Sequence, residues 1–119
     1  MKIQEFNKIF EERIKKMRSV MVSKGTVYTA GDQDRLHNFK VSGRIGGTSP
    51  ETALKGMLIK HLTSVWDMID ECENCDENGG VDFDCKRVDE KIGDVITYMV
   101  LLEALFIERL QNQERGMSR

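Results

Sequence analysis

The sequence has few of the residues that interrupt helices or favour β-sheets. Its 119 residues include a single proline, and aromatic residues make up only 7% of the chain. Charged residues make up 32% and alternate with apolar ones over long stretches, a composition typical of helical proteins. The length suits one domain. We therefore expect a single all-α domain over residues 1–119.

Long apolar runs are also lacking. No stretch of about 18 or more uninterrupted apolar residues is present, which argues against a membrane-spanning helix. Residues 1–5 do not begin the apolar core of a signal peptide. We therefore expect a cytoplasmic protein without a membrane partner.

Cysteine and negative charge are concentrated in one segment. Cys72, Cys75 and Cys85 are odd in number and flank an acidic, glycine-containing loop expected over about 73–85, so they do not form a secreted disulfide framework. Residues 70–84 hold seven acidic and no basic residues, which leaves 18 basic against 13 acidic residues elsewhere. That balance suits an anionic small ligand. The basic residues are scattered, so no nucleic-acid polymer is expected as a partner.

Apolar residues recur at helical spacing in three long segments. Helices are expected over 2–23, from 50 to about 72, and from about 86 to 113. Thr48, Ser49 and Pro50 supply capping hydroxyls and a first-turn proline to the second of them. A loop with a short helix is expected over 28–40, followed by a flexible turn over 42–47.

The last helix is apolar on nearly every side between residues 95 and 107, apart from Thr97 and Glu103. A helix that is apolar all round must be buried all round. Three long helices of one chain can hardly surround it. We therefore predict a helical bundle of three long helices plus a short one, completed by oligomerisation as a homodimer or homotetramer.

Two helices carry acidic side chains beside their apolar faces. On the second helix the stripe comprises Lys60, Ser64, Asp67 and Glu71, with Asp70 at its edge. On the third it comprises Glu90, Asp94 and Thr97, flanked by Tyr98. Carboxylates held against a core are costly unless they are paired or bind a metal. Because helical bundles build divalent-metal sites in this way, we predict a Mg²⁺ site formed by Asp67, Asp70, Glu71, Glu90 and Asp94. The alternative is solvated helix faces with salt bridges.

Four motifs follow one another in a recognisable order. They are Lys24-Gly25-x-x-Tyr28, Asp34-Arg35-x-x-Asn38-Phe39, Ser49-Pro50-Glu51-x-Ala53-x-x-x-Met57-x-x-Lys60-His61, and Asp89-Glu90-Lys91-Ile92-Gly93-Asp94-x-x-x-Tyr98. Over residues 20–108 the series resembles phage and prophage proteins related to the all-α nucleoside triphosphate pyrophosphohydrolases, the MazG-like and dimeric dUTPase-like superfamily. Members of that superfamily are oligomeric bundles. They use magnesium held by Glu and Asp to hydrolyse a nucleotide to its monophosphate and pyrophosphate.

The resemblance implies a function for these residues. Asp67, Glu71, Glu90 and Asp94 would form the catalytic metal site, together with Lys60. The substrate would be bound by Lys24, Tyr28, Arg35, His37, Asn38, Phe39, Lys60, His61 and Tyr98. Phe39 and Tyr28 could instead anchor their loop to the core, and Arg35 could simply pair with a neighbouring aspartate.

One position departs from the superfamily pattern. Its members carry Glu three residues before the aspartate of the last motif, where this chain has Lys91 and keeps only Glu90, one residue earlier. Two nucleotide-related hypotheses therefore stay open, beside a purely structural or protein-binding helical bundle. The first is a magnesium-dependent pyrophosphohydrolase. The second is a non-catalytic protein that uses the same inter-helix pocket to sequester a nucleotide, for example a signalling nucleotide of host defence.

Overall fold

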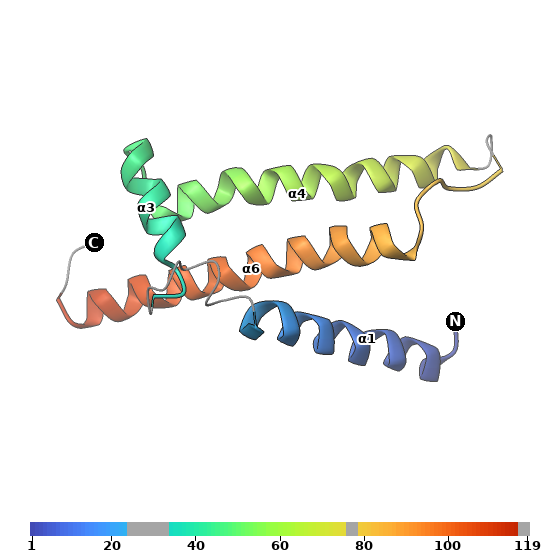
Figure 1. Ribbon diagram of the computed structural model, residues 1–119, viewed down its shortest axis with the longest axis horizontal. Coiled ribbons are helices and arrows are strands. Elements are labelled where there is room, and N and C mark those ends of the chain that lie inside the picture. Colours follow the sequence, from blue (N-terminus) through green and yellow to red (C-terminus); the bar gives the residue numbers. More distant parts are fainter. Residues whose placement is uncertain (24–33, 76–78, 117–119) are drawn as a thin grey trace.

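The computed structural model of the chain describes residues 1–23, 34–75 and 79–116, which form helices and the short connections between them (Figure 1). No strand is present in this part of the chain, so the all-α prediction is confirmed. None of the helices described is long and apolar enough to cross a membrane. The predicted ligand-binding residues Lys24 and Tyr28 lie outside the described residues.

Two long antiparallel helices form the frame of the structure (Figure 1). They are α4 (Pro50–Glu73) and α6 (Cys85–Glu114). Side-chain caps start both helices, because Ser49 Oγ accepts the Thr52 N–H at 3.1 Å and Asp84 Oδ1 accepts the Arg87 N–H at 2.9 Å. The core between them includes the buried side chains of Leu54, Leu58, Leu101 and Leu105.

Two ion pairs and one contact between a histidine and an aspartate join α4 to α6 along their length. They are Glu51–Arg109 at 2.5 Å, His61–Asp94 at 3.5 Å and Glu71–Arg87 at 2.9 Å. The pairs lie near both ends and in the middle of the helical hairpin. Together with the leucine core they define which residues of the two helices are level with one another.

The first helix lies along the beginning of α6 (Figure 1). It comprises α1 (Ile3–Arg18) and a π-helical turn, η1 (Ser19–Ser23), which confirms the helix expected over 2–23. Arg13 and Lys16 both contact the Asp89 carboxylate at 3.1 Å. Gly93 permits this approach, since a Cβ there would lie 2.9 Å from Nη1 of Arg13. No residue of α1 is buried, so its attachment depends largely on these polar contacts.

Helix α3 (His37–Gly46) crosses the beginning of α4 and corrects one prediction (Figure 1). A flexible turn was expected over 42–47 because of its glycines, but the helix continues through Gly46. It ends at Gly47, whose φ of 67° is left-handed. Gly43 serves packing: a Cβ there would lie 2.9 Å from the backbone carbon of Ser49 and from the Thr48 oxygen. The glycine lets α3 lie directly against the start of α4.

We predict that Gly43→Ala lowers the free energy of unfolding by about 1–2 kcal/mol. The added methyl group meets rigid backbone, and such overpacking costs more than the improved helix propensity gains. Gly56→Ala is the matched control, because nothing lies within 4 Å of a Cβ at that helical position. It should stabilise the protein by about 0.5–1 kcal/mol. Chemical denaturation of the two variants measures both effects, and equal effects of the same sign would contradict the packing role.

Candidate functional site

A cavity of about 380 Å³ lies between α3, α4 and α6. Its volume is within the range of small-molecule sites in proteins. Six of the residues predicted from the sequence line it: Arg35, Asn38, Phe39, His61, Asp94 and Tyr98. They come from three separate motifs of the chain, and the fold brings them to one place.

Aromatic side chains form one wall of this cavity. The Tyr98 ring stacks on the His61 ring, with centroids 4.8 Å apart and planes at 25°. The Phe39 ring meets Tyr98 edge-on at 6.2 Å. Phe39 is only 8% exposed and belongs to the hydrophobic core, so it anchors α3 as well as lining the cavity. The wall offers π-faces on which a planar ring can stack.

The polar groups around this wall differ in charge and in hydrogen-bonding character. Arg35 brings a half-buried guanidinium, and Asn38 an exposed amide at the start of α3. On the hairpin, His61 Nδ1 lies 3.5 Å from the Asp94 carboxylate. A guanidinium suits a phosphate, and an amide can both donate to and accept from the edge of a base. The arrangement therefore fits a planar anionic ligand.

Four further lining residues were missed by the sequence analysis: Val20, Ser42, Met57 and Leu101. Ser42 lies one helical turn after Asn38, and Met57 lies one turn before His61. Thr97, which the sequence analysis placed in the same stripe as Asp94, also lines the cavity. Helical spacing from the predicted residues would have found Ser42 and Met57 as well, because positions three or four apart share a face.

The structure does not bring the five predicted metal ligands together at one point. Asp94 lines the cavity, whereas Glu71 pairs with Arg87 at the far end of the hairpin. The second carboxylate oxygen of Glu71 is buried and has no hydrogen-bond partner among the described residues. Asp67 and Asp70 line a shallow hollow elsewhere on α4, while Glu90 is exposed.

These positions do not fit a magnesium site within one chain. In the described ranges, no group of three or more His, Cys, Asp or Glu side chains lies where it could hold a metal ion. Magnesium needs several oxygen ligands converging on one point. Lys60, which was predicted beside the metal, is exposed, and neither it nor His37 lines the cavity.

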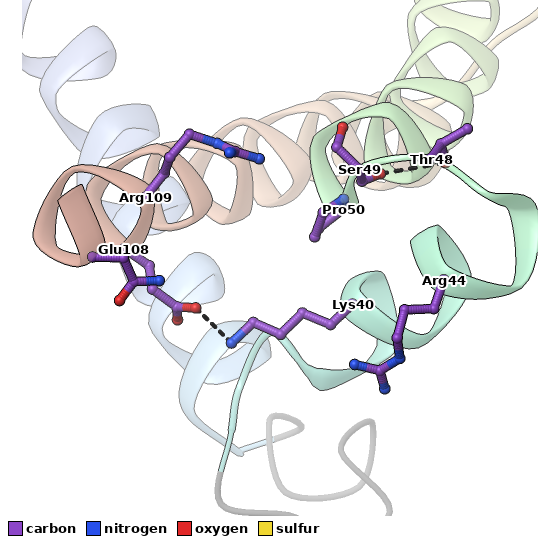
Figure 2. A pocket seen from close by; sticks show the side chains of 8 residues that line it. Lys40, Arg44, Thr48, Ser49, Pro50, Glu108 and Arg109 are labelled. Atoms are coloured by element: carbon purple, nitrogen blue, oxygen red, sulfur yellow. Dashed lines mark hydrogen bonds and ion pairs between the residues drawn. The ribbon is translucent and has the colours of Figure 1, made fainter. Parts of the chain in front are cut away.

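A second cavity, of about 490 Å³, lies where α3 meets the start of α4 and the end of α6 (Figure 2). Lys40 and Arg109 project towards it from two sides, but each is already paired. Lys40 Nζ lies 2.6 Å from Asp34 and 2.5 Å from Glu108, and Arg109 binds Glu51. The carboxylates offset most of the positive charge, so this cavity is a weaker candidate for an anionic ligand.

The Lys40 contacts shift two pKa values. Burial by itself raises the pKa of Asp34, but hydrogen bonds from Lys40 and the Leu36 N–H outweigh it and hold that pKa below its usual value. Burial by itself lowers the pKa of Lys40, but hydrogen bonds to Asp34 and Glu108 raise it above its usual value. This cluster ties α3 to α6.

The cavity between α3, α4 and α6 is therefore the candidate functional site. Comparisons of the chain with protein-family models, curated proteins and solved structures give no match. The chemistry of the lining residues and their arrangement around Tyr98 are the observations from which a function can be inferred.

We predict that the Asp34 contacts stabilise the protein at neutral pH and that this contribution is lost in acid. The folded-state pKa of Asp34 is lowered, so the contribution is full above the unfolded-state pKa of about 3.9 and is lost as the pH falls through the folded-state pKa. Solvent screening limits it to about 1 kcal/mol or less. The difference in unfolding free energy between wild type and Asp34→Asn should be constant near pH 7 and shrink below about pH 4. A difference independent of pH would contradict the ionic role.

Proposed function

We propose that this protein binds a nucleotide in the cavity between α3, α4 and α6. The observation that supports this most is that six sequence-predicted residues line one cavity. Arg35 would bind the phosphates, and Asn38 would bind a base edge. The stacked rings of Tyr98 and His61 would form the wall against which the base or sugar packs. The resemblance of the motifs to MazG-like phage proteins, which act on nucleotides, is consistent with this proposal.

Two versions of the proposal differ in their chemistry. In one, the protein is a magnesium-dependent pyrophosphohydrolase that releases a nucleoside monophosphate and pyrophosphate. In the other, it captures a nucleotide without cleaving it, for example one used in host defence. The geometry favours capture, because Asp94 is the one carboxylate among the described residues lining the cavity and it is paired with His61. Hydrolysis would need further carboxylates that a single chain keeps apart.

The proposal extends to assembly and location. We infer a homodimer or homotetramer, because many large apolar side chains are exposed on a single chain. A cytoplasmic site of action, in the host cytoplasm if the gene belongs to a phage, follows from a nucleotide ligand. Magnesium is proposed as a cofactor only if the protein is a pyrophosphohydrolase.

Nucleotide binding can be tested with Asn38→Ala. The side chain is exposed on α3, so its removal should leave the fold intact while weakening binding about 3- to 10-fold through the loss of one hydrogen bond. Isothermal titration with a panel of nucleoside triphosphates and cyclic dinucleotides measures the change. Asn112→Ala, in the second cavity, is the matched control and should bind as the wild type does. If none of the nucleotides binds the wild type, the proposal is wrong.

Ion-exchange analysis of the same nucleotides after incubation with Mg²⁺ separates the two versions. Unchanged nucleotides that nevertheless bind are expected for capture. Monophosphate and pyrophosphate that disappear with a chelator, and with Asp94→Asn, would establish the hydrolase and overturn capture. Asp94→Asn keeps the side-chain volume, so a loss of turnover would report on the carboxylate charge.

A further inference from the structure

A groove on the surface of α4 plays no part in the proposed nucleotide site. It has a volume of about 320 Å³ and is lined by Ile59, Leu62, Thr63, Trp66, Asp67 and Asp70. None of these residues lines the cavity between α3, α4 and α6. The groove is therefore a separate surface, and its lining residues indicate what it binds.

Two neighbouring rows of side chains form the walls of this groove. Residues four apart follow one another in a row on the surface of a helix, and adjacent rows leave a groove between them. The two rows here are Ile59–Thr63–Asp67 and Leu62–Trp66–Asp70. Each row begins with an aliphatic residue and ends with an aspartate. The groove is therefore apolar at one end and anionic at the other.

Trp66 is the largest side chain in the groove. It is 61% exposed, and within the described part of the chain its indole has no ring contact and no hydrogen bond. Ile59, at the apolar end, is 53% exposed. An exposed indole face attracts cations, and a guanidinium can stack on it.

Asp67 and Asp70 place two negative charges side by side at the anionic end. They are three residues apart and are therefore neighbours on the helix surface, where like charges repel each other. Both are exposed, and neither side chain has an ion pair or a hydrogen bond among the described residues. The described chain thus leaves this repulsion uncompensated.

The position of these aspartates near the end of α4 makes their charge more unfavourable. The carboxyl end of a helix carries a partial negative charge, so basic residues are favoured there and acidic ones are not. The last turn of α4 nevertheless has no basic residue, and no lysine or arginine occurs between Lys60 and Lys86. Arg87 of α6 pairs with Glu71, not with the aspartates of the groove. Such a conflict with local preference is expected where a protein binds a partner.

We propose that this groove receives an arginine side chain of a partner protein. The methylene stem of the arginine lies along Leu62 and Trp66, and its guanidinium lies between Asp67 and Asp70. The guanidinium stacks on the indole and donates charge-assisted hydrogen bonds to the carboxylates. One arginine therefore satisfies the apolar and the anionic end of the groove together.

Other occupants fit fewer of these features. A divalent metal ion needs more oxygen ligands than two aspartates supply, and the described residues hold no group of three potential metal ligands. The apolar face of a second copy would bury two unpaired carboxylates, which is costly. A lysine supplies the charge, but its ammonium is more strongly hydrated and lacks the planar fork of arginine.

The fluorescence of Trp66 measures binding directly, because Trp66 is the single tryptophan of the chain. The probe is an acetylated and amidated peptide of three Ala-Arg repeats, titrated into the full chain with EDTA present. It should change the Trp66 emission in a saturable way. The corresponding Ala-Lys peptide should bind about threefold or more weakly, and the Ala-Glu peptide should leave the emission unchanged.

The double variant Asp67→Asn/Asp70→Asn tests the anionic end. Both substitutions keep the side-chain volume and remove the charge, so the affinity for the arginine peptide should fall about tenfold. The matched control is Glu12→Gln/Asp82→Asn, which removes two exposed carboxylates outside the groove. Its affinity should stay within about twofold of the wild type. Circular dichroism checks that both variants keep their helices.

Three results would overturn the proposal. The first is an arginine peptide that produces neither a change in emission nor heat in a calorimetric titration. The second is an equal loss of affinity in the two double variants, which would show a general attraction to acidic surface. The third is a change of oligomeric state in Asp67→Asn/Asp70→Asn, detected by sedimentation, which would assign the groove to a second copy. None of them bears on nucleotide binding, because the groove and the cavity share no lining residue.

Discussion

The packing of α4 against α6 is the contact on which the rest of the structure depends. Leucines from both helices fill their interface, and two ion pairs together with the His61–Asp94 contact set their register. This arrangement gives the hairpin two unlike faces. On one face α3 packs across α4, and the cavity forms where it meets the hairpin. On the other, apolar side chains stay exposed on a single chain.

The cavity owes its chemistry to the register of the hairpin. Antiparallel packing brings His61 of α4 level with Asp94 and Tyr98 of α6, so His61 contacts the Asp94 carboxylate and stacks on the Tyr98 ring at the same place. Asn38 of α3, and Arg35 just before that helix, then join them from a different motif. None of the three helices contains a complete site, and a change in the register would dismantle it. Recognition of an anion beside an aromatic wall is the chemistry this arrangement supports.

The same packing explains why the predicted metal ligands do not converge. Asp67 and Asp70 belong to parts of α4 that face away from the contact with α6, while Glu71 is used in an ion pair with Arg87. Only Asp94 reaches the cavity from the predicted set, as far as the described residues show. Capture of a nucleotide does not require a cluster of carboxylates. Metal-dependent hydrolysis requires one, because the carboxylates must hold the metal ion.

The sequence by itself determined the helices and much of the cavity lining. Periodicity and capping are local properties, so residues 2–23, the proline-led start of α4 and the extent of α6 could be predicted to within a residue or two. Motifs on α3, α4 and α6 likewise identified Asn38, His61 and Asp94. The tertiary structure alone decided that α3 continues through Gly43, because the close approach of α4 makes use of its missing side chain. It also decided which carboxylates meet, because the rotation of a helix about its axis is set by its packing partners and not by its own sequence period.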